Sequence, residues 1–132
     1  MLMTGEVNMD TLPGIWNDKM VEYLGIRPNN DSEGVLQDVH WSSGMLGYFP
    51  TYALGSAYAA QFYYAMKKEI DVEKLIRENK IDVINNWLKE KIHQYGSSKS
   101  PKELLLEVTG EAFDPKYYIR YLKEKYTQIY GL

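Results

Sequence analysis

The sequence predicts an all-α fold, with about six helices in a single domain that spans residues 1–132. Three observations support this prediction: apolar residues recur at spacings of three and four, capping residues precede several of these runs, and glycines follow them. The length fits one domain. With 45% apolar and 25% charged residues, the composition is that of an ordinary globular protein and argues against disorder.

The front of the chain contains one clearly marked helix. Apolar residues between Leu12 and Leu24 follow a helical spacing. Asp10 or Thr11 is placed to cap the start, and Gly25 lies where a helix-ending glycine belongs. Turn-forming residues then predict a loop over 27–34. The next segment, 35–43, is short and ambiguous, and 44–50 is expected to be irregular or extended.

A long helix is predicted from Pro50 to about Ile70, and it is unusual because it is apolar on nearly every side. Such a helix belongs in the middle of a domain. The charge distribution agrees, since residues 1–66 hold only two basic and seven acidic groups, whereas 67–132 hold thirteen basic and eleven acidic groups. Sparse charge indicates burial, either in the core or against a partner.

The back half shows conventional amphipathic helices. Asp71 can cap a short helix that runs through Asn79, and an apolar face over 81–95 ends at Gly96. The run from Ser100 to Glu103 matches a capping box with proline at the first helical position, and this helix is expected to end at Gly110. A last helix restarts at Asp114-Pro115.

Composition excludes several functional classes. The absence of cysteine removes disulfides, thiolate catalysis and cysteine-based metal sites. Only two histidines are present, and neither begins an HExxH motif. A net charge of −3 argues against nucleic-acid binding. The longest uncharged stretch, 39–66, is broken by three glycines and a proline, so no membrane segment is expected. Without a secretory signal, a cytoplasmic location is expected.

The segment Gly34-Val35-Leu36-Gln37-Asp38-Val39-His40-Trp41 is the richest in chemistry. Asp38 can orient and polarise the ring of His40, and the nearby Tyr48 can donate to a developing oxyanion. A structural interpretation competes with this one: a polar cluster that fastens a buried turn, with Trp41, Tyr48 and Phe49 as core. A triad with Ser42 or Ser43, and a metal cluster of acidic residues around His40, are both disfavoured because the residues lie in one short segment or a solvated turn.

These residues read GxxQDxHW, and in this respect the chain resembles the thermostable carboxypeptidase (carboxypeptidase Taq) family of zinc metallocarboxypeptidases. The resemblance continues through residues 12–34, 47–70 and 114–132. Family members are predominantly helical, often dimeric enzymes that remove single amino acids from peptide C-termini. The resemblance implies that this sequence corresponds to the C-terminal part of that fold, and that the long helix from Pro50 is covered there by the upstream part.

The resemblance implies roles for five residues. His40 would face the substrate and donate to the scissile carbonyl or oxyanion, and Tyr48 would stabilise the tetrahedral intermediate. Gln37 and Asp38 would hold the substrate-contacting residues in place rather than act on the substrate themselves. Trp41 would support the wall of the substrate site. Zinc, held in the family by the HExxH histidines and a downstream glutamate, is expected only for the full-length fold. No metal ligand or cofactor is therefore expected in this chain.

The expected function is that of a carboxypeptidase-related chain that is inactive alone, because the zinc ligands and the general base of HExxH are missing. We expect either a homo-oligomer or a complex with a separate HExxH-bearing chain, with a peptide substrate once assembled. The main alternative is a non-catalytic helical module that binds peptides or proteins. A third hypothesis is an unrelated enzyme in which His40 and its sequence neighbours carry the chemistry.

Overall fold

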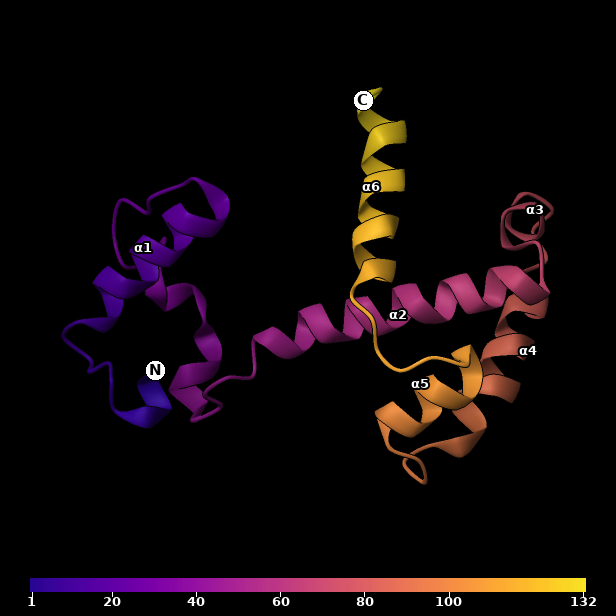
Figure 1. Ribbon diagram of the computed structural model, residues 1–132, viewed down its shortest axis with the longest axis horizontal. Helices are drawn as coiled ribbons and strands as arrows, with labels where there is room; N and C mark the ends of the chain where they lie inside the picture. The colour runs from indigo at the N-terminus through magenta and orange to yellow at the C-terminus, as the bar shows by residue number, and fades with distance from the viewer. The chain divides into compact units, whose positions relative to one another are not determined.

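The computed structural model describes every residue from Met1 to Leu132 and contains helices but no strands. The six α-helices are α1 (Leu12–Leu24), α2 (Pro50–Glu69), α3 (Val72–Arg77), α4 (Ile81–Lys91), α5 (Pro101–Thr109) and α6 (Lys116–Tyr130). This confirms the all-α prediction and its number of helices (Figure 1). None of the helices combines the length and the apolar character that a membrane span requires.

The chain divides into two compact units, Met1–Phe49 and Pro50–Leu132. The first contains α1 and three 3₁₀ turns, of which Val35–Gln37 and Val39–Ser43 lie in the segment that was ambiguous from sequence. The second contains α2 to α6. Each unit is described by itself below, and the single domain over 1–132 stays a prediction.

In the first unit, α1 begins and ends at the expected residues. Gly25 adopts a left-handed conformation with φ 70°, and its N–H closes the helix on the Val21 carbonyl. The cap differs from the prediction. Thr11 occupies the cap position, but its side chain makes no capping hydrogen bond to the helix. Its hydroxyl is instead engaged with Asn8, whose Oδ1 lies 3.0 Å away. The polar turn before the helix has taken the side chain that the capping rule assigns to the helix end.

Gly34 lies at a close approach between the loop and α1. A Cβ atom at this position would lie 2.9 Å from Asn17 Oδ1 and 3.4 Å from the Asn30 carbonyl oxygen. Asn17 Oδ1 is buried without a hydrogen-bond partner, so the space around it is closed. The first residue of the GxxQDxHW motif is therefore a glycine for packing reasons.

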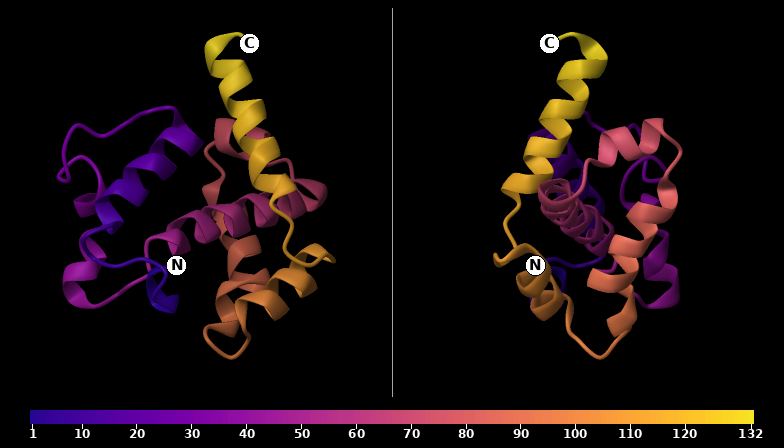
Figure 2. Two further views of the ribbon diagram at one scale, coloured as in Figure 1. Left: turned by 60° about the vertical axis from the view of Figure 1, so that its left-hand side comes forward. Right: turned by 90° about the vertical axis from the view of Figure 1, so that its right-hand side faces the viewer.

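In the second unit, α2 is the central element, and it packs against both α5 and α6. Figures 1 and 2 show α6 and α5 on different sides of α2. The buried side chains of α2 begin at its third turn and are Ala57, Ala60, Gln61, Tyr64, Ala65 and Met66. In its first turns Tyr52 and Leu54 are exposed.

Gln61 ties α2 to the connection between α5 and α6. Its side chain is fully buried, at 0% exposure. The amide nitrogen donates to Thr109 Oγ1 at 3.2 Å and to the Ala112 carbonyl at 3.0 Å, while its oxygen accepts from the Asp114 N–H at 3.0 Å. A buried amide is stable here because both of its ends are hydrogen-bonded.

Tyr64 makes a second link between α2 and α6. Its hydroxyl donates to Glu124 at a distance of 2.6 Å, and Glu124 also accepts from Arg120 at 2.7 Å. Burial, reinforced by the bond to Glu124, raises the pKa of Tyr64 to about 12. The same hydroxyl, followed by the Arg120 guanidinium, lowers the pKa of Glu124.

The far end of α2 packs on α3 and α4 through a small core of Met66, Val72 and Trp87. The indole N–H of Trp87 donates to Glu69 at 2.9 Å, which satisfies its polar atom. The Asp71 cap is present, but α3 ends at Arg77 rather than at Asn79. Asn79 adopts φ 58°, a left-handed conformation that a helix interior excludes.

The helices of the back half otherwise begin and end near the predicted positions. The Ser100–Glu103 capping box is complete, with each side chain bonded to the other residue's backbone N–H, and α5 closes at Gly110. The predicted face over 81–95 is divided, since α4 stops at Lys91 and a 3₁₀ turn covers His93–Tyr95. Gly96 ends this turn as expected.

Candidate active site

The candidate site lies in the first unit, where the chain turns from Asp38 into the 3₁₀ segment Val39–Ser43. Asp38 is buried, and its Oδ1 accepts from the backbone N–H of His40 at 3.2 Å. The same oxygen lies 2.8 Å from His40 Nδ1. One carboxylate oxygen thus caps the turn and holds the imidazole ring, so the ring orientation is set by the local backbone.

This contact determines which protons His40 can offer. An ionised carboxylate only accepts, so the short bond to Asp38 requires a proton on Nδ1. In the neutral ring, Nε2 is then a hydrogen-bond acceptor, and only the imidazolium carries a donor at both nitrogens. With Nδ1 turned to Asp38, a hydrogen bond donated from Nε2 of His40 therefore requires the imidazolium.

Two aromatic rings flank the imidazole. The Tyr48 ring centroid lies 4.9 Å from that of His40, and the Phe49 centroid lies 5.7 Å away in an edge arrangement. Tyr48 is 43% exposed and Phe49 is 48% exposed. The structural interpretation that placed these two rings in the core of this chain is therefore wrong. Asp38 and His40 are brought together with their side chains largely covered, and the more exposed Tyr48 ring lies beside them.

Gln37 and Trp41 occupy different positions from this cluster. Gln37 is exposed, and its amide donates to the Ser32 carbonyl, which fastens the preceding loop. Trp41 packs edge-on against Trp16 of α1, with ring centroids 6.0 Å apart. Trp41 therefore anchors the 3₁₀ segment that carries His40 to α1. This position agrees with the supporting role that the resemblance implies for it.

Sequence reasoning assigned no functional role to two residues of this neighbourhood. Phe49 contacts the His40 ring. Its position directly after Tyr48 in the sequence could have indicated that it lies near this site. Trp16 supports Trp41 from 25 positions away in the sequence, and no local pattern connects the two. Only the folded unit brings Trp16 to this place.

The chain offers no donor set for a metal ion. No group of three or more His, Cys, Asp or Glu side chains lies close enough together to hold one. Zinc ligation requires three or four such donors. The residues present therefore do not fit a zinc site, and no catalytic step through a metal is assigned to them.

Together these features define a helical chain in which a buried carboxylate is paired with a histidine beside a half-exposed tyrosine. The chain belongs to the carboxypeptidase Taq (M32) metallopeptidase family, whose sequence profile matches residues 1–126. This confirms the resemblance drawn from the GxxQDxHW motif.

Two carboxypeptidases with similar sequences support the assignment to this family. The chain is 48% identical over 127 residues to Thermostable carboxypeptidase 1 of Pyrococcus furiosus, covering 96% of this chain and 26% of that protein. It is 42% identical over 132 residues to Carboxypeptidase 1 of Bacillus subtilis, covering 99% of this chain and 26% of that protein. The chain thus spans about a quarter of the length of these relatives.

Solved structures show the same fold. Metallocarboxypeptidase 1 of Trypanosoma cruzi matches with a TM-score of 0.88 and 45% identity, over 95% of this chain and 26% of that one. The M32 carboxypeptidase of Deinococcus radiodurans matches with a TM-score of 0.90 and 32% identity, over 99% of this chain and 27% of that one. The predicted likeness to a part of the metallocarboxypeptidase fold is therefore confirmed.

Proposed function

We propose that this chain supplies the substrate-contacting C-terminal part of a zinc metallocarboxypeptidase that removes single residues from peptide C-termini. By itself the chain is inactive, because the zinc ligands and general base come from an HExxH-bearing part of the family fold. The observation that carries the proposal is the Asp38–His40 pair beside Tyr48, in a chain without a donor set for metal.

In this proposal His40 and Tyr48 contact the substrate. Protonated His40 donates to the carbonyl oxygen of the scissile peptide, where negative charge develops during attack. The Tyr48 hydroxyl donates to the same developing charge. Asp38 is a positioning residue, since it acts through the His40 ring and fixes its orientation. Zinc held by the HExxH part would supply the activated water, and the residues of this chain would orient and stabilise the carbonyl.

The test is a chimera in which this chain replaces the matched quarter of the Bacillus subtilis relative, assayed for release of C-terminal amino acids with zinc present. The isolated chain should release none, and the chimera should be active. His40→Ala should lower kcat/KM by about 10²–10³-fold, the loss typical of an oxyanion donor. His93→Ala is the matched control, because His93 is the other histidine and lies exposed on a 3₁₀ turn.

Asp38→Asn tests the positioning role separately. The amide oxygen can still accept from Nδ1, but it lacks the charge that makes a hydrogen bond to a carboxylate stronger than one to a neutral amide. The kcat value should then fall with little change in KM, while His93→Ala changes neither. A folded, zinc-loaded chimera that lacks activity would refute the proposal, as would full activity in His40→Ala. Peptide binding by the isolated chain without metal would favour the non-catalytic interaction module instead.

A further inference from the structure

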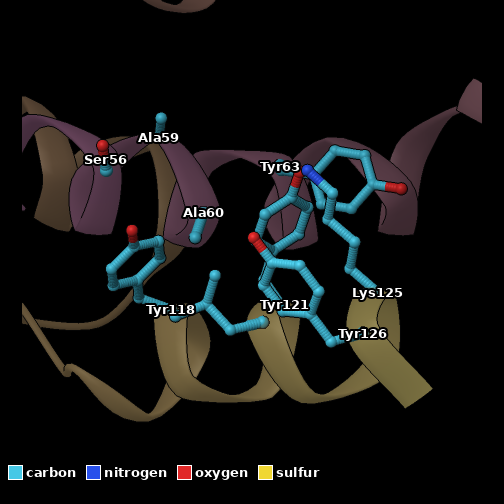
Figure 3. A pocket seen from close by; sticks show the side chains of 9 residues that line it. Ser56, Ala59, Ala60, Tyr63, Tyr118, Tyr121, Lys125 and Tyr126 are labelled. Atoms are coloured by element: carbon cyan, nitrogen blue, oxygen red, sulfur yellow. The ribbon is translucent and has the colours of Figure 1, made fainter. Parts of the chain in front are cut away.

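The second unit contains a pocket of about 560 Å³ between α2 and α6, which Figure 3 shows from close by. Its lining consists of tyrosine rings, small side chains, one leucine and one lysine. No histidine and no carboxylate belongs to this lining, so the pocket lacks a pair like that of Asp38 and His40. Further residues that serve the proposed reaction are therefore expected around that pair, in the first unit.

Two neighbouring residues of α1 lie against the two ends of the GxxQDxHW segment. At its start, a Cβ atom on Gly34 would lie 2.9 Å from Asn17 Oδ1, so the backbone of the segment runs close against the helix. At its end, the Trp41 ring packs edge-on against Trp16, with the ring centroids 6.0 Å apart and the planes at 90°. The segment is therefore held on α1 at both ends, with the histidine–carboxylate pair between them.

Between these two contacts, the segment is ordered by its own turns. The 3₁₀ turn Val35–Gln37 packs on α1, and Val35 is buried. Asp38 caps the next turn by accepting from the His40 N–H, and the same carboxylate oxygen lies 2.8 Å from the imidazole Nδ1. Because the imidazole is bonded to its own turn, the ring can be no better placed than the turn itself is on α1.

We propose that α1 positions His40 by holding the GxxQDxHW segment at both ends, and that Trp16 is the positioning residue at the end next to the imidazole. Trp41 follows His40 directly in the chain, so its packing on Trp16 acts one residue away from the ring. An edge-on pair of indoles has a preferred geometry in addition to its buried area, so it orients the turn as well as covering it. This inference rests on the proposed function in one respect, that His40 contacts the substrate.

A purely structural role for Trp16 predicts a different result. Loss of a contact that only stabilises the unit lowers the unfolding temperature and leaves the kcat of the folded enzyme unchanged. Loss of a positioning contact lowers kcat in the folded enzyme, because a misplacement of about 1 Å at a reacting group can cost about 10²-fold in rate. The two roles are therefore separated by kinetics measured below the unfolding temperature.

The first test uses the Bacillus subtilis chimera with zinc, at a temperature at which every variant is folded. Trp16→Leu should lower kcat by about ten- to 10²-fold with little change in KM. Trp16→Phe keeps an aromatic ring against Trp41 and should retain kcat within about threefold. Trp87→Phe is the control for a tryptophan that only stabilises, since Trp87 belongs to the core of the second unit, and it should lower Tm without lowering kcat.

A double variant shows whether Trp16 acts through His40. In the His40→Ala background, Trp16→Leu should cause no further loss of kcat, because the imidazole that it positions is already absent. Losses that multiply would mean that Trp16 acts on the reaction by another route, and they would overturn the proposal. An unchanged kcat for Trp16→Leu in an active chimera would overturn it as well.

Nuclear magnetic resonance of the isolated chain provides a readout that needs no activity. The chemical shifts of isotope-labelled ring nitrogens report which nitrogen of a histidine carries the proton. At about pH 9, well above the ordinary histidine pKa, His40 should carry its proton on Nδ1, as the bond to Asp38 requires. Trp16→Leu should move the His40 shifts towards those of the exposed His93, and Trp16→Phe should leave them in place. The His93 signals are the internal control and should not move.

Gly34→Ala tests the other end of the segment, and it carries the same measurement if Trp16→Leu does not fold. The added Cβ meets Asn17 and displaces the start of the segment from α1. It should move the His40 shifts in the same direction as Trp16→Leu does. Unchanged His40 shifts in either variant, once folded, would overturn the proposal.

This proposal and the proposed function fail separately. An inactive chimera, together with His40 shifts that respond to Trp16→Leu, would refute the proposed function and retain the positioning of His40 by α1. An active chimera that is indifferent to Trp16→Leu would do the reverse.

Discussion

Replacing Gln61 with methionine tests how the second unit is held together. Methionine keeps the length and nearly the volume of the side chain but makes none of its hydrogen bonds. The substitution would leave the Asp114 N–H and the Ala112 carbonyl without the partners they have at 3.0 Å, at a position with 0% exposure. An unsatisfied buried polar group costs about 1–3 kcal/mol. Two such groups predict a loss of about 2–6 kcal/mol.

The assay is urea unfolding of the isolated chain, followed by circular dichroism at a helix-sensitive wavelength. Gln128→Met is the matched control, since Gln128 lies exposed on α6, and it should change the unfolding free energy by less than about 0.5 kcal/mol. Gln61→Met should move the midpoint to lower urea without changing the slope. If the two variants unfold at the same urea concentration, the hydrogen bonds of Gln61 do not stabilise the unit and the reasoning is wrong.

Three further predictions concern single positions. Gly34→Ala should destabilise the chain by about 1–2 kcal/mol through overpacking, whereas Gly14→Ala, whose Cβ would meet nothing within 4 Å, should be neutral or stabilising in urea unfolding. The raised pKa of Tyr64, about 12 against an ordinary 10, stabilises the fold below pH 10, and this contribution is lost as pH rises towards 12. Unfolding titrations of Tyr64→Phe should therefore show a shallower alkaline loss than those of the unmutated chain, by at most about 2.7 kcal/mol, and identical curves would refute the assignment. Trp87→Phe removes the bond to Glu69 and should lower the free energy of unfolding by about 1–3 kcal/mol in thermal or urea melts, and an unchanged midpoint would count against that role.

Helix positions were predictable because their signals are local. The capping box at Ser100–Glu103 lies at the start of α5, and the glycine after Leu24 lies at the end of α1. Each acts within a few residues of the helix end that it sets. The local rule failed at Thr11, whose hydroxyl is bonded within the preceding turn, and at Asn79, whose φ of 58° ends α3 early. At Thr11 two local interactions compete for the same hydroxyl, and sequence alone does not rank them.

The candidate site also contains both local contacts, which the sequence predicts, and contacts that depend on the folded chain. The pairing of Asp38 with His40 is local, two residues apart, and a motif reading identified it. The exposure of Tyr48 and Phe49 depends on what else covers them, and composition wrongly favoured burial. Packing of Trp16 on Trp41 has no local signal.

By itself, the sequence determined the helical class, most helix ends, the family and the Asp38–His40–Tyr48 set. The tertiary structure alone decided that Gln61 reaches the connection around Asp114, 53 residues away, and that α2 and α6 leave a groove between them. The physical reason is range. Caps, periodicity and motifs are contacts between residues near in sequence, whereas burial, hydrogen-bond satisfaction and open surface depend on segments that meet only after the chain has folded.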